Sequence, residues 1–409
     1  MTFYRPSYYK NFKCTGSDCA FTCCREWAIG VDSKTLKKWQ NLRLPDCTIS
    51  PADYVTNGQI QLNADGLCPF LDESHLCNMV KAHGEESLSI TCHTFPREWH
   101  VFDERTEETL SIACPEVFDT VWNLERFEIE KSDRPIPFSH PAEEPEPCQE
   151  LFFKIRDWFL EILQGDNISK NSHPVSTELA LKIIFFFALD LYEAYVDDRL
   201  TDSFFEHYKK HNLYDQLVTE ISRNESAPMN SMFEQNALLL DLSENYRKQG
   251  MYCQWLEPLC KSAKEMESVL NADSHTTSND NIPTSVNGIE KALEEFQQIW
   301  KSNERHHRNI LCEEIYSTCL IPGGDLYSIV LKLQWIAMTH AVYKQAMFLD
   351  WLKSRDKASA SGETSANSML IATMIFRMTG YSEADIEEYL ENSFEDIIWE
   401  WPYFALVVG

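Results

Sequence analysis

The pattern of apolar and polar positions changes about a third of the way along the chain. Beyond residue 149, apolar side chains recur every three to four residues, which is the spacing of one helix face. The two clearest stripes are Leu151, Phe152, Ile155, Trp158, Phe159, Ile162 and Leu163, and Leu326, Ile329, Val330, Leu333, Ile336, Ala337 and Ala341. We interpret both stripes as buried core faces, so residues 149–409 are expected to form a helical domain.

Helix boundaries in this domain also have sequence signals. Ser382-Glu-Ala-Asp385 has the form of a capping box, and it follows Gly380, a typical helix stop. Two stretches rich in Ser, Thr, Asn and Asp interrupt the helical pattern near 271–288 and 354–368. Such composition lacks the apolar residues that a packed core needs, so both stretches are predicted to be mobile loops.

The first 131 residues instead show short apolar stretches separated by turn signals such as Asn57-Gly58 and Asp65-Gly66. Only residues 33–42 predict a helix there, since Leu36 and Trp39 fall on one face. The region is otherwise expected to consist of irregular loops that a metal holds together.

Residues 132–148 contain five prolines in 17 residues. Proline fixes φ and lacks a backbone donor, so this stretch predicts a linker. The expected fold is therefore mainly α. A cysteine-rich, metal-binding module (1–131) is followed by the linker and an acidic helical domain (149–409).

The net charge of the chain limits the classes of molecule that it is expected to bind. The 409-residue chain has a net charge of -28 at pH 7; residues 1–100 hold 10 Lys/Arg and 11 Asp/Glu, which leaves 26 and 53 for the remainder. Such a surface repels phosphates and argues against nucleic acid and anionic membranes as partners. The acidity provides solubility, or it attracts lysine-bearing protein surfaces.

Targeting signals and membrane spans are not evident in the sequence. The longest apolar run, residues 183–189, is far shorter than the ~20 residues that span a bilayer. Residues 1–10 contain no apolar signal-peptide core and no small-residue cleavage site. We therefore expect a cytoplasmic protein without a membrane partner; its oligomeric state is not evident from the sequence.

Cysteine is concentrated near the N-terminus, where nine of the fourteen cysteines precede residue 115. One tight set is Cys14, Cys19, Cys23 and Cys24, and a second is Cys68, Cys77 and Cys92. A chain with 44% hydrophobic residues can bury a core without disulfides, and reducing compartments do not sustain them. Closely spaced thiols suit iron or zinc, so we favour a metal centre over disulfides.

The sequences around these cysteines resemble a known family. They read Cys14-Thr-Gly-Ser-Asp-Cys19-Ala-Phe-Thr-Cys23-Cys24, Cys68-Pro-Phe-Leu-Asp-Glu-Ser-His-Leu-Cys77 and Cys92-His-Thr-Phe-Pro-Arg97. The pattern is similar to the flagellin lysine-N-methylase family and to a wider group of iron- or zinc-chelating proteins with a Cys-x-x-Cys-x-x-Cys-Cys signature. Residues 8–31, 67–79 and 91–97 carry the resemblance, and 113–116 echo it. The gaps between Cys14, Cys19 and Cys23 are longer than in the signature.

The resemblance implies methyl transfer from S-adenosylmethionine to lysines of flagellin, aided by a four-iron, four-sulfur cluster. The candidate metal ligands are Cys14, Cys19, Cys23, Cys24, Cys68, Cys77, Cys92 and Cys114. One such cluster needs four thiolates, so the spare cysteines could bind zinc or serve structure. Cys47, Cys148, Cys253, Cys260, Cys312 and Cys319 are expected to be small buried side chains.

Binding of S-adenosylmethionine rests on the resemblance alone. Cys24 directly follows Cys23, so the Cys-x-x-x-Cys-x-x-Cys motif of radical enzymes is absent, and no G-x-G-x-x-G turn is present. Arg97 is the candidate cofactor-binding residue, because a guanidinium can fork onto a carboxylate. It could also offset the charge of the cluster or form a structural salt bridge.

Other polar residues are less informative. His93, beside Cys92, could ligate a metal, although histidines near clusters are more often hydrogen-bonding neighbours. His306 and His307 are expected at the surface of a helix. The 64 acidic residues give no way to choose the base that must deprotonate a lysine. Two rival functions remain open, a non-catalytic iron- or zinc-binding interaction protein and an iron–sulfur redox sensor.

Overall fold

The structure is a computed structural model that describes residues 2–44, 49–103, 105–132, 148–166, 175–224, 226–271, 282–355, 366–394 and 396–409. Residues 133–147, almost all of the predicted linker, lie outside this described part, and so do Cys47 and most of both predicted loops. The helix that follows the first loop already begins at Val286.

Helices dominate the described residues, as the sequence predicts. The α-helices are α1 (Ser33–Trp39), α2 (Asn78–His83), α3 (Ile90–Thr94), α4 (Pro115–Trp122), α5 (Gln149–Gln164), α6 (Thr177–Val196), α7 (Asp202–Lys210), α8 (Tyr214–Arg223), α9 (Pro228–Lys248), α10 (Cys253–Leu270), α11 (Val286–Ser302), α12 (Glu304–Thr318), α13 (Leu326–Ser354), α14 (Ala366–Met378), α15 (Glu383–Ser393) and α16 (Trp401–Val408). The expected N-terminal helix corresponds to α1, and Ser382 and Asp385 form the predicted capping box of α15.

A four-stranded sheet in the N-terminal region is not evident from the sequence pattern. Its order is β4 (Arg97–Val101), β5 (Arg105–Leu110), β1 (Thr2–Pro6) and β6 (Ile129–Ser132). Strand β1 pairs in parallel with β5, whereas the two outer pairs are antiparallel. A two-stranded hairpin joins β2 (Val55–Thr56) to β3 (Gln59–Ile60). The prediction of irregular loops alone is therefore wrong for this region.

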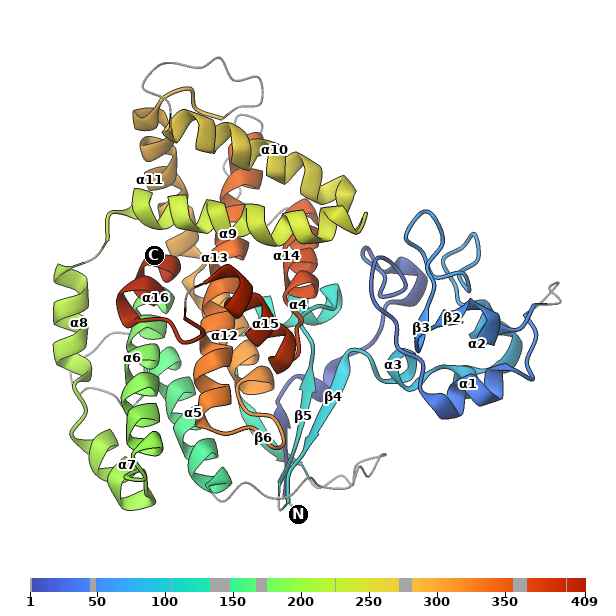
Figure 1. The fold of residues 1–409 in the computed structure, drawn as a ribbon, viewed down its shortest axis with the longest axis horizontal. Coiled ribbons are helices and arrows are strands. Elements are labelled where there is room, and N and C mark those ends of the chain that lie inside the picture. Colours follow the sequence, from blue (N-terminus) through green and yellow to red (C-terminus); the bar gives the residue numbers. More distant parts are fainter. Residues whose placement is uncertain are drawn as a thin grey trace.

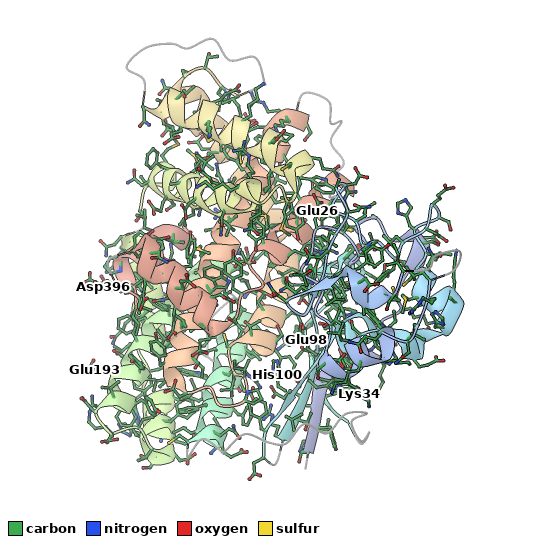
Figure 2. All side chains as sticks on the ribbon, turned by 45° about the vertical axis from the view of Figure 1, so that its right-hand side comes forward. Glu26, Lys34, Glu98, His100, Glu193 and Asp396 are labelled. Carbon is green, nitrogen blue, oxygen red and sulfur yellow. The ribbon has the colours of Figure 1, made fainter. Side chains whose placement is uncertain are left out.

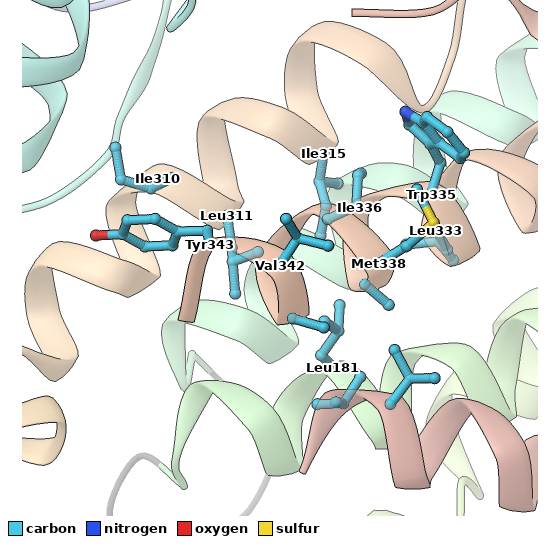
Figure 3. Packing of buried hydrophobic residues seen from close by; sticks show 14 of the residues in the cluster. Leu181, Ile310, Leu311, Ile315, Leu333, Trp335, Ile336, Met338, Val342 and Tyr343 are labelled. Carbon is cyan, nitrogen blue, oxygen red and sulfur yellow. The ribbon is translucent and has the colours of Figure 1, made fainter. Parts of the chain in front are cut away.

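The main core surrounds α13, which runs through the middle of the helical body (Figure 1). Every residue of both predicted apolar stripes is buried, which confirms their reading as core faces. Figure 3 shows part of this packing, in which Ile315 of α12, Val342 and Tyr343 of α13 and Leu181 of α6 belong to one cluster. Within the described ranges, no helix combines the length and apolar character needed to cross a membrane.

The core also includes residues that precede the linker. Tyr8, Phe102 and Phe118 belong to the same buried cluster as Phe153 of α5. A second, smaller core consists of Ile29, Val31, Trp39, Ile60, Cys68, Phe70 and Met79. It lies within the segment that carries α1, α2, α3, β2 and β3, beside the helical body in Figure 1. The sheet thus packs with the helices, and the cysteine-bearing segment has its own small core.

A buried ion pair joins the sheet to the helices. Arg156 of α5 donates from Nη1 to Glu107 Oε2 at 2.5 Å and from Nη2 to Glu107 Oε1 at 2.8 Å, and both side chains are fully buried. Arg105 reaches the same carboxylate at 2.5 Å. This bidentate geometry is the strong form of an arginine–carboxylate pair, so it fixes α5 against β5.

The two histidines on α12, His306 and His307, were predicted to lie at the surface, and the structure places them differently. His307 is only 2% exposed, and its ring stacks on Trp300 with centroids 3.6 Å apart. His306 stacks on Trp122 at 4.7 Å. The expected surface position is therefore wrong for His307, because α11 and α12 pack together and cover it.

Candidate functional site

The loop that carries Cys19, Cys23 and Cys24 is attached to the helical body by Arg377 of α14. The Arg377 guanidinium donates to the Phe21 carbonyl at 2.7 Å, the Thr22 carbonyl at 3.1 Å and the Ala113 carbonyl at 3.0 Å. It also lies 4.1 Å from the centre of the Phe21 ring. A planar guanidinium can satisfy several acceptors at once, so this side chain fixes the loop between Cys19 and Cys23.

The second set of cysteines comes from three neighbouring turns and helices. Cys68 is 5% exposed, and its backbone amide donates to the Cys24 carbonyl at 2.8 Å, which joins the two sets. Cys77 is the residue before α2, and Cys92 lies in α3, where its amide donates to Ser89 Oγ at 3.2 Å. Cys24, Cys77 and Cys92 all pack against the small core.

Electrostatic coupling shows which thiols lie close together. A hydrogen bond with Cys24, together with burial, raises the pKa of Cys23 far above its ordinary value. Burial, and then the charges of Cys92, Cys77 and Cys23, raise the pKa of Cys68 to about 12. Burial and the charges of Cys23 and Cys77 raise the pKa of Cys92 to about 11. Cys23 is thus electrostatically coupled to Cys24, Cys68 and Cys92, and Cys77 is coupled to Cys68 and Cys92.

Two further predicted ligands, Cys19 and Cys114, are coupled to Cys23. Burial and the charges of Cys19 and Cys23 raise the pKa of Cys114, the residue before α4, to about 11. We call the resulting group the cysteine cluster, and its members are Cys19, Cys23, Cys24, Cys68, Cys77, Cys92 and Cys114. Cys14 is exposed, and its Sγ accepts a hydrogen bond from the Gly16 amide at 3.4 Å. The structure thus gathers seven of the eight predicted ligands and leaves Cys14 at the surface.

The cysteine cluster has the thiol chemistry of a metal centre without its coordination geometry. In the part of the chain that the structure describes, no three His, Cys, Asp or Glu side chains converge to hold a metal ion. The described cysteines are all free thiols. The metal-binding module therefore stays a prediction. Cys260, Cys312 and Cys319 are buried, as predicted, whereas Cys148 and Cys253 are only partly buried.

Two other predicted site residues lie near the cysteine cluster in sequence. Arg97 begins β4, and its guanidinium lies over the Phe12 ring at 5.0 Å from the centroid. His93 is exposed on α3 beside Cys92. Neither position tests the predicted role in cofactor or metal binding.

The sequence did not single out a group of carboxyl groups between the sheet and α12. Glu98 of β4 is exposed as a residue, yet desolvation of its carboxyl raises its pKa. Burial and the charge of Glu98 raise the pKa of Glu314 to about 7. Burial also raises the pKa of Glu313 to about 8, and the charges of Glu314 and Glu98 add to it. We call Glu98, Glu313 and Glu314 the acidic recess; perturbed carboxyls of this kind often mark functional sites.

The surroundings of the acidic recess are polar. Figure 2 shows Glu98 and His100 where the sheet meets the helices. Burial lowers the pKa of His100 to about 4, so this imidazole is neutral at pH 7. The Lys332 ammonium, whose pKa burial lowers, donates to the Tyr381 carbonyl at 3.2 Å. The sequence signal for these carboxyl groups was the adjacent pair Glu313 and Glu314, which interrupts the apolar pattern of α12.

Comparison with known proteins places these features in a family. The chain is 37% identical over 134 residues to the flagellar biosynthetic protein FliU of Salmonella muenchen, which covers 30% of this chain and 78% of that protein. It is equally identical over 134 residues to a lysine-N-methylase of Salmonella typhimurium LT2, and 35% identical over 132 residues to that of Salmonella choleraesuis SC-B67. These matches cover 30% of this chain and 33% of each lysine-N-methylase.

The length of the matched region decides which conclusions the similarity to these relatives supports. No protein-family model and no solved structure matches the chain. The match covers only a third of the lysine-N-methylases, so it does not extend to the whole of those proteins. It does cover most of FliU at an identity well above 30%. The chain therefore belongs to the family of FliU and the lysine-N-methylases.

Proposed function

We propose that this protein is a lysine N-methyltransferase that transfers a methyl group from S-adenosylmethionine to surface lysines of flagellin, and that the transfer depends on an iron–sulfur cluster. The observation that carries this proposal is the similarity to relatives named lysine-N-methylase and flagellar biosynthetic protein FliU. The acidic surface, with a net charge of -28, is compatible with a lysine-bearing protein substrate.

The cysteine cluster supports the metal-dependent part of the proposal. Its free thiols outnumber the four thiolates that a four-iron, four-sulfur cluster requires, and soft thiolate ligands suit iron. Cys23, Cys68, Cys77 and Cys92 would hold the cluster, after their side chains turn toward one another. A cluster bound in this way would supply redox chemistry or would stabilise the fold of this segment. Arg377 is electrostatically coupled to Cys23, so its positive charge would offset part of the negative charge of a cluster bound there.

The direct test of the activity is mass spectrometry of flagellin. Flagellin is incubated with anaerobically purified protein, with or without S-adenosylmethionine, and digested. The proposal expects a mass gain of one or more methyl units on lysine only when S-adenosylmethionine is present. Flagellin that gains no methyl group under these conditions would contradict the proposed activity.

Serine substitutions test the role of the cysteines. Cys68→Ser, Cys77→Ser and Cys92→Ser should each remove bound iron and activity together, because a hydroxyl is a poor ligand for iron. Cys312→Ser is the matched control, since Cys312 is fully buried in the main core on α12. Iron that remains in all three variants would exclude these ligands.

The colour of the protein separates the rival functions. Anaerobic protein that is brown, with broad absorbance near 400 nm, would exclude a zinc-only interaction module. Brown protein that binds no S-adenosylmethionine would favour the redox sensor. Colourless, zinc-loaded protein without methyl transfer would favour the non-catalytic metal-binding protein.

A further inference from the structure

Arg377, the last residue but one of α14, is a buried cation that is only 5% exposed. Its guanidinium lies 4.1 Å from the centre of the Phe21 ring and 5.1 Å from the centre of the Trp27 ring. Both rings belong to the cysteine-bearing segment, and their faces attract a positive charge. Arg377 therefore lies, out of water, at the place where this segment meets the helical body.

The hydrogen bonds of Arg377 connect two stretches of chain that each lead into a cysteine. Nη2 and Nη1 donate, at 2.7 Å and 3.1 Å, to the carbonyl groups of the two residues before Cys23. Nε donates at 3.0 Å to the carbonyl group of the residue before Cys114. Because Cys23 and Cys114 are far apart in sequence, a single side chain holds the backbone beside both of them.

No carboxylate neutralises the charge of Arg377. Among the described residues, no Asp or Glu side chain forms an ion pair with its guanidinium. Burial lowers the pKa of Arg377, and the titratable groups that act on it are the Tyr252 hydroxyl and the thiols of Cys23, Cys114 and Cys19. Arginine keeps its proton in proteins, and a buried charge is normally paired or part of a metal site. The guanidinium therefore lacks a counter-anion.

Arg377 also has hydrogen-bond donors to spare. A guanidinium carries five N–H groups, and backbone carbonyl groups accept from three of those on Arg377. Nη1 and Nη2 each keep a second hydrogen, for which the described residues supply no acceptor. The missing negative charge and the spare donors both indicate that an anionic group belongs beside Cys23 and Cys114.

The thiols next to Arg377 can become that anionic group. A free thiol is mostly neutral at pH 7, because its ordinary pKa is about 8.5. A thiol that binds a metal loses its proton, so each ligating cysteine brings one negative charge. A metal centre that includes Cys23 or Cys114 would therefore supply the charge that Arg377 lacks.

Helix α10 holds the same loop from a second direction. The Phe21 ring packs edge-on against the Trp255 ring, with centroids 4.8 Å apart. Glu26 Oε1 accepts a hydrogen bond from the Tyr252 amide, just before α10, at 2.8 Å. Residues 21–26, which include Cys23 and Cys24, are thus held by α10 as well as by α14. Removal of the Arg377 charge therefore leaves other contacts that keep the loop in place.

We propose that Arg377 is the counter-cation and a positioning residue of the metal centre, which holds the backbone beside Cys23 and Cys114 and stabilises the negative charge of the bound thiolates. The proposal rests on the metal dependence proposed above and names the residue of the helical body that tunes the centre. Uptake of one electron adds one negative charge, so a neighbouring cation stabilises the reduced state more than the oxidised state. Arg377 thus raises the reduction potential.

A potentiometric titration measures this effect without any methyl transfer. The full-length protein is reconstituted anaerobically with iron and sulfide and is then titrated with dithionite, which supplies the electron, while its visible absorbance is followed. Arg377→Met removes the charge but keeps an unbranched side chain. The reduced state should then become about tenfold less stable relative to the oxidised state, so the midpoint potential should fall by about 59 mV.

A second variant separates the charge of Arg377 from its hydrogen bonds. Arg377→Lys keeps the charge but loses the fork onto the backbone carbonyl groups, so its midpoint potential should stay close to that of the wild type. Its loop should open more often, so a chelator should remove iron about tenfold faster. Arg223→Met, at an exposed position of α8, is the matched control and should change neither quantity. Far-ultraviolet circular dichroism checks the fold of each variant, and Arg377→Lys still tests the proposal if Arg377→Met does not fold.

The possible outcomes separate this role from the proposed function. Equal midpoint potentials of the wild type and Arg377→Met would overturn the counter-cation role, and equal rates of iron loss from the wild type and Arg377→Lys would overturn the positioning role. Methylation of flagellin by the wild type would leave the proposed function standing in both cases. If the variants behave as expected but flagellin gains no methyl group, the role of Arg377 stands and the methyltransferase function fails. Wild-type protein that binds no iron would overturn both the role of Arg377 and the iron–sulfur dependence.

Discussion

Replacing Arg156 with methionine tests the buried ion pair that joins α5 to the sheet. The change keeps an unbranched side chain near Phe153 and Tyr316 but removes both hydrogen bonds to Glu107. Removing one partner of a buried ion pair costs about 3–5 kcal/mol, because the other charge stays buried. Arg105 still reaches the Glu107 carboxylate, so we expect the lower end of this range.

A loss of about 3 kcal/mol corresponds to a change of roughly 150-fold in the unfolding equilibrium constant. Burial opposes ionisation of Glu107, but Arg156 and Arg105 outweigh it, so the Glu107 pKa lies below its ordinary value. The ionised carboxylate therefore contributes stability above the unfolded pKa, and this contribution is lost as pH falls through the folded pKa. The difference between Arg156→Met and wild type should be largest near pH 7.5 and smaller near pH 4.

The assay is urea unfolding followed by far-ultraviolet circular dichroism at both pH values. A second variant, Arg156→Met combined with Glu107→Gln, should be more stable than Arg156→Met alone by about 1 kcal/mol, because the buried carboxylate that Arg105 compensates only in part is then gone. A loss below about 1 kcal/mol for Arg156→Met, or an equal loss at both pH values, would refute the assignment of this pair as a main connection between sheet and helices.

Three further predictions concern the loop, the acidic recess and the surface. Arg377→Lys keeps the positive charge but loses the hydrogen bonds of the guanidinium to three backbone carbonyl groups. The loop should then open more often, so alkylation of Cys19 and Cys23, followed by mass spectrometry, should become about tenfold faster relative to alkylation of Cys260. Unchanged alkylation rates would contradict this prediction. The Glu313 pKa is raised to about 8, so stability should fall as pH rises from about 5 to 8, and Glu313→Gln should flatten that decline in urea unfolding; an equally steep decline would count against it. Raising salt from about 0.1 M to 1 M should slow association with flagellin, measured by surface plasmon resonance, more than it weakens cofactor binding; a salt-insensitive rate would leave the net charge to solubility.

The sequence by itself determined the helical pattern beyond residue 149 and the concentration of thiols near the N-terminus. Helical periodicity is a local property, because residues three or four apart share a face whatever the rest of the chain does. The stripes at 151–163 and 326–341 and the cap at Ser382 were therefore readable without the structure. The cysteine spacing was equally local, and it identified the family on its own.

Only the tertiary structure decided the sheet, the neighbours of each thiol and the acidic recess. Strand β1 finds its partner β5 about a hundred residues away, and such pairing depends on the packing of the whole chain rather than on five adjacent residues. Arg377, which follows the loop between Cys19 and Cys23 by more than 350 residues, binds two carbonyl groups of that loop. Glu313 and Glu314 look like ordinary surface acids in the sequence, and their raised pKa values arise only when folding removes water from them and brings Glu98 near.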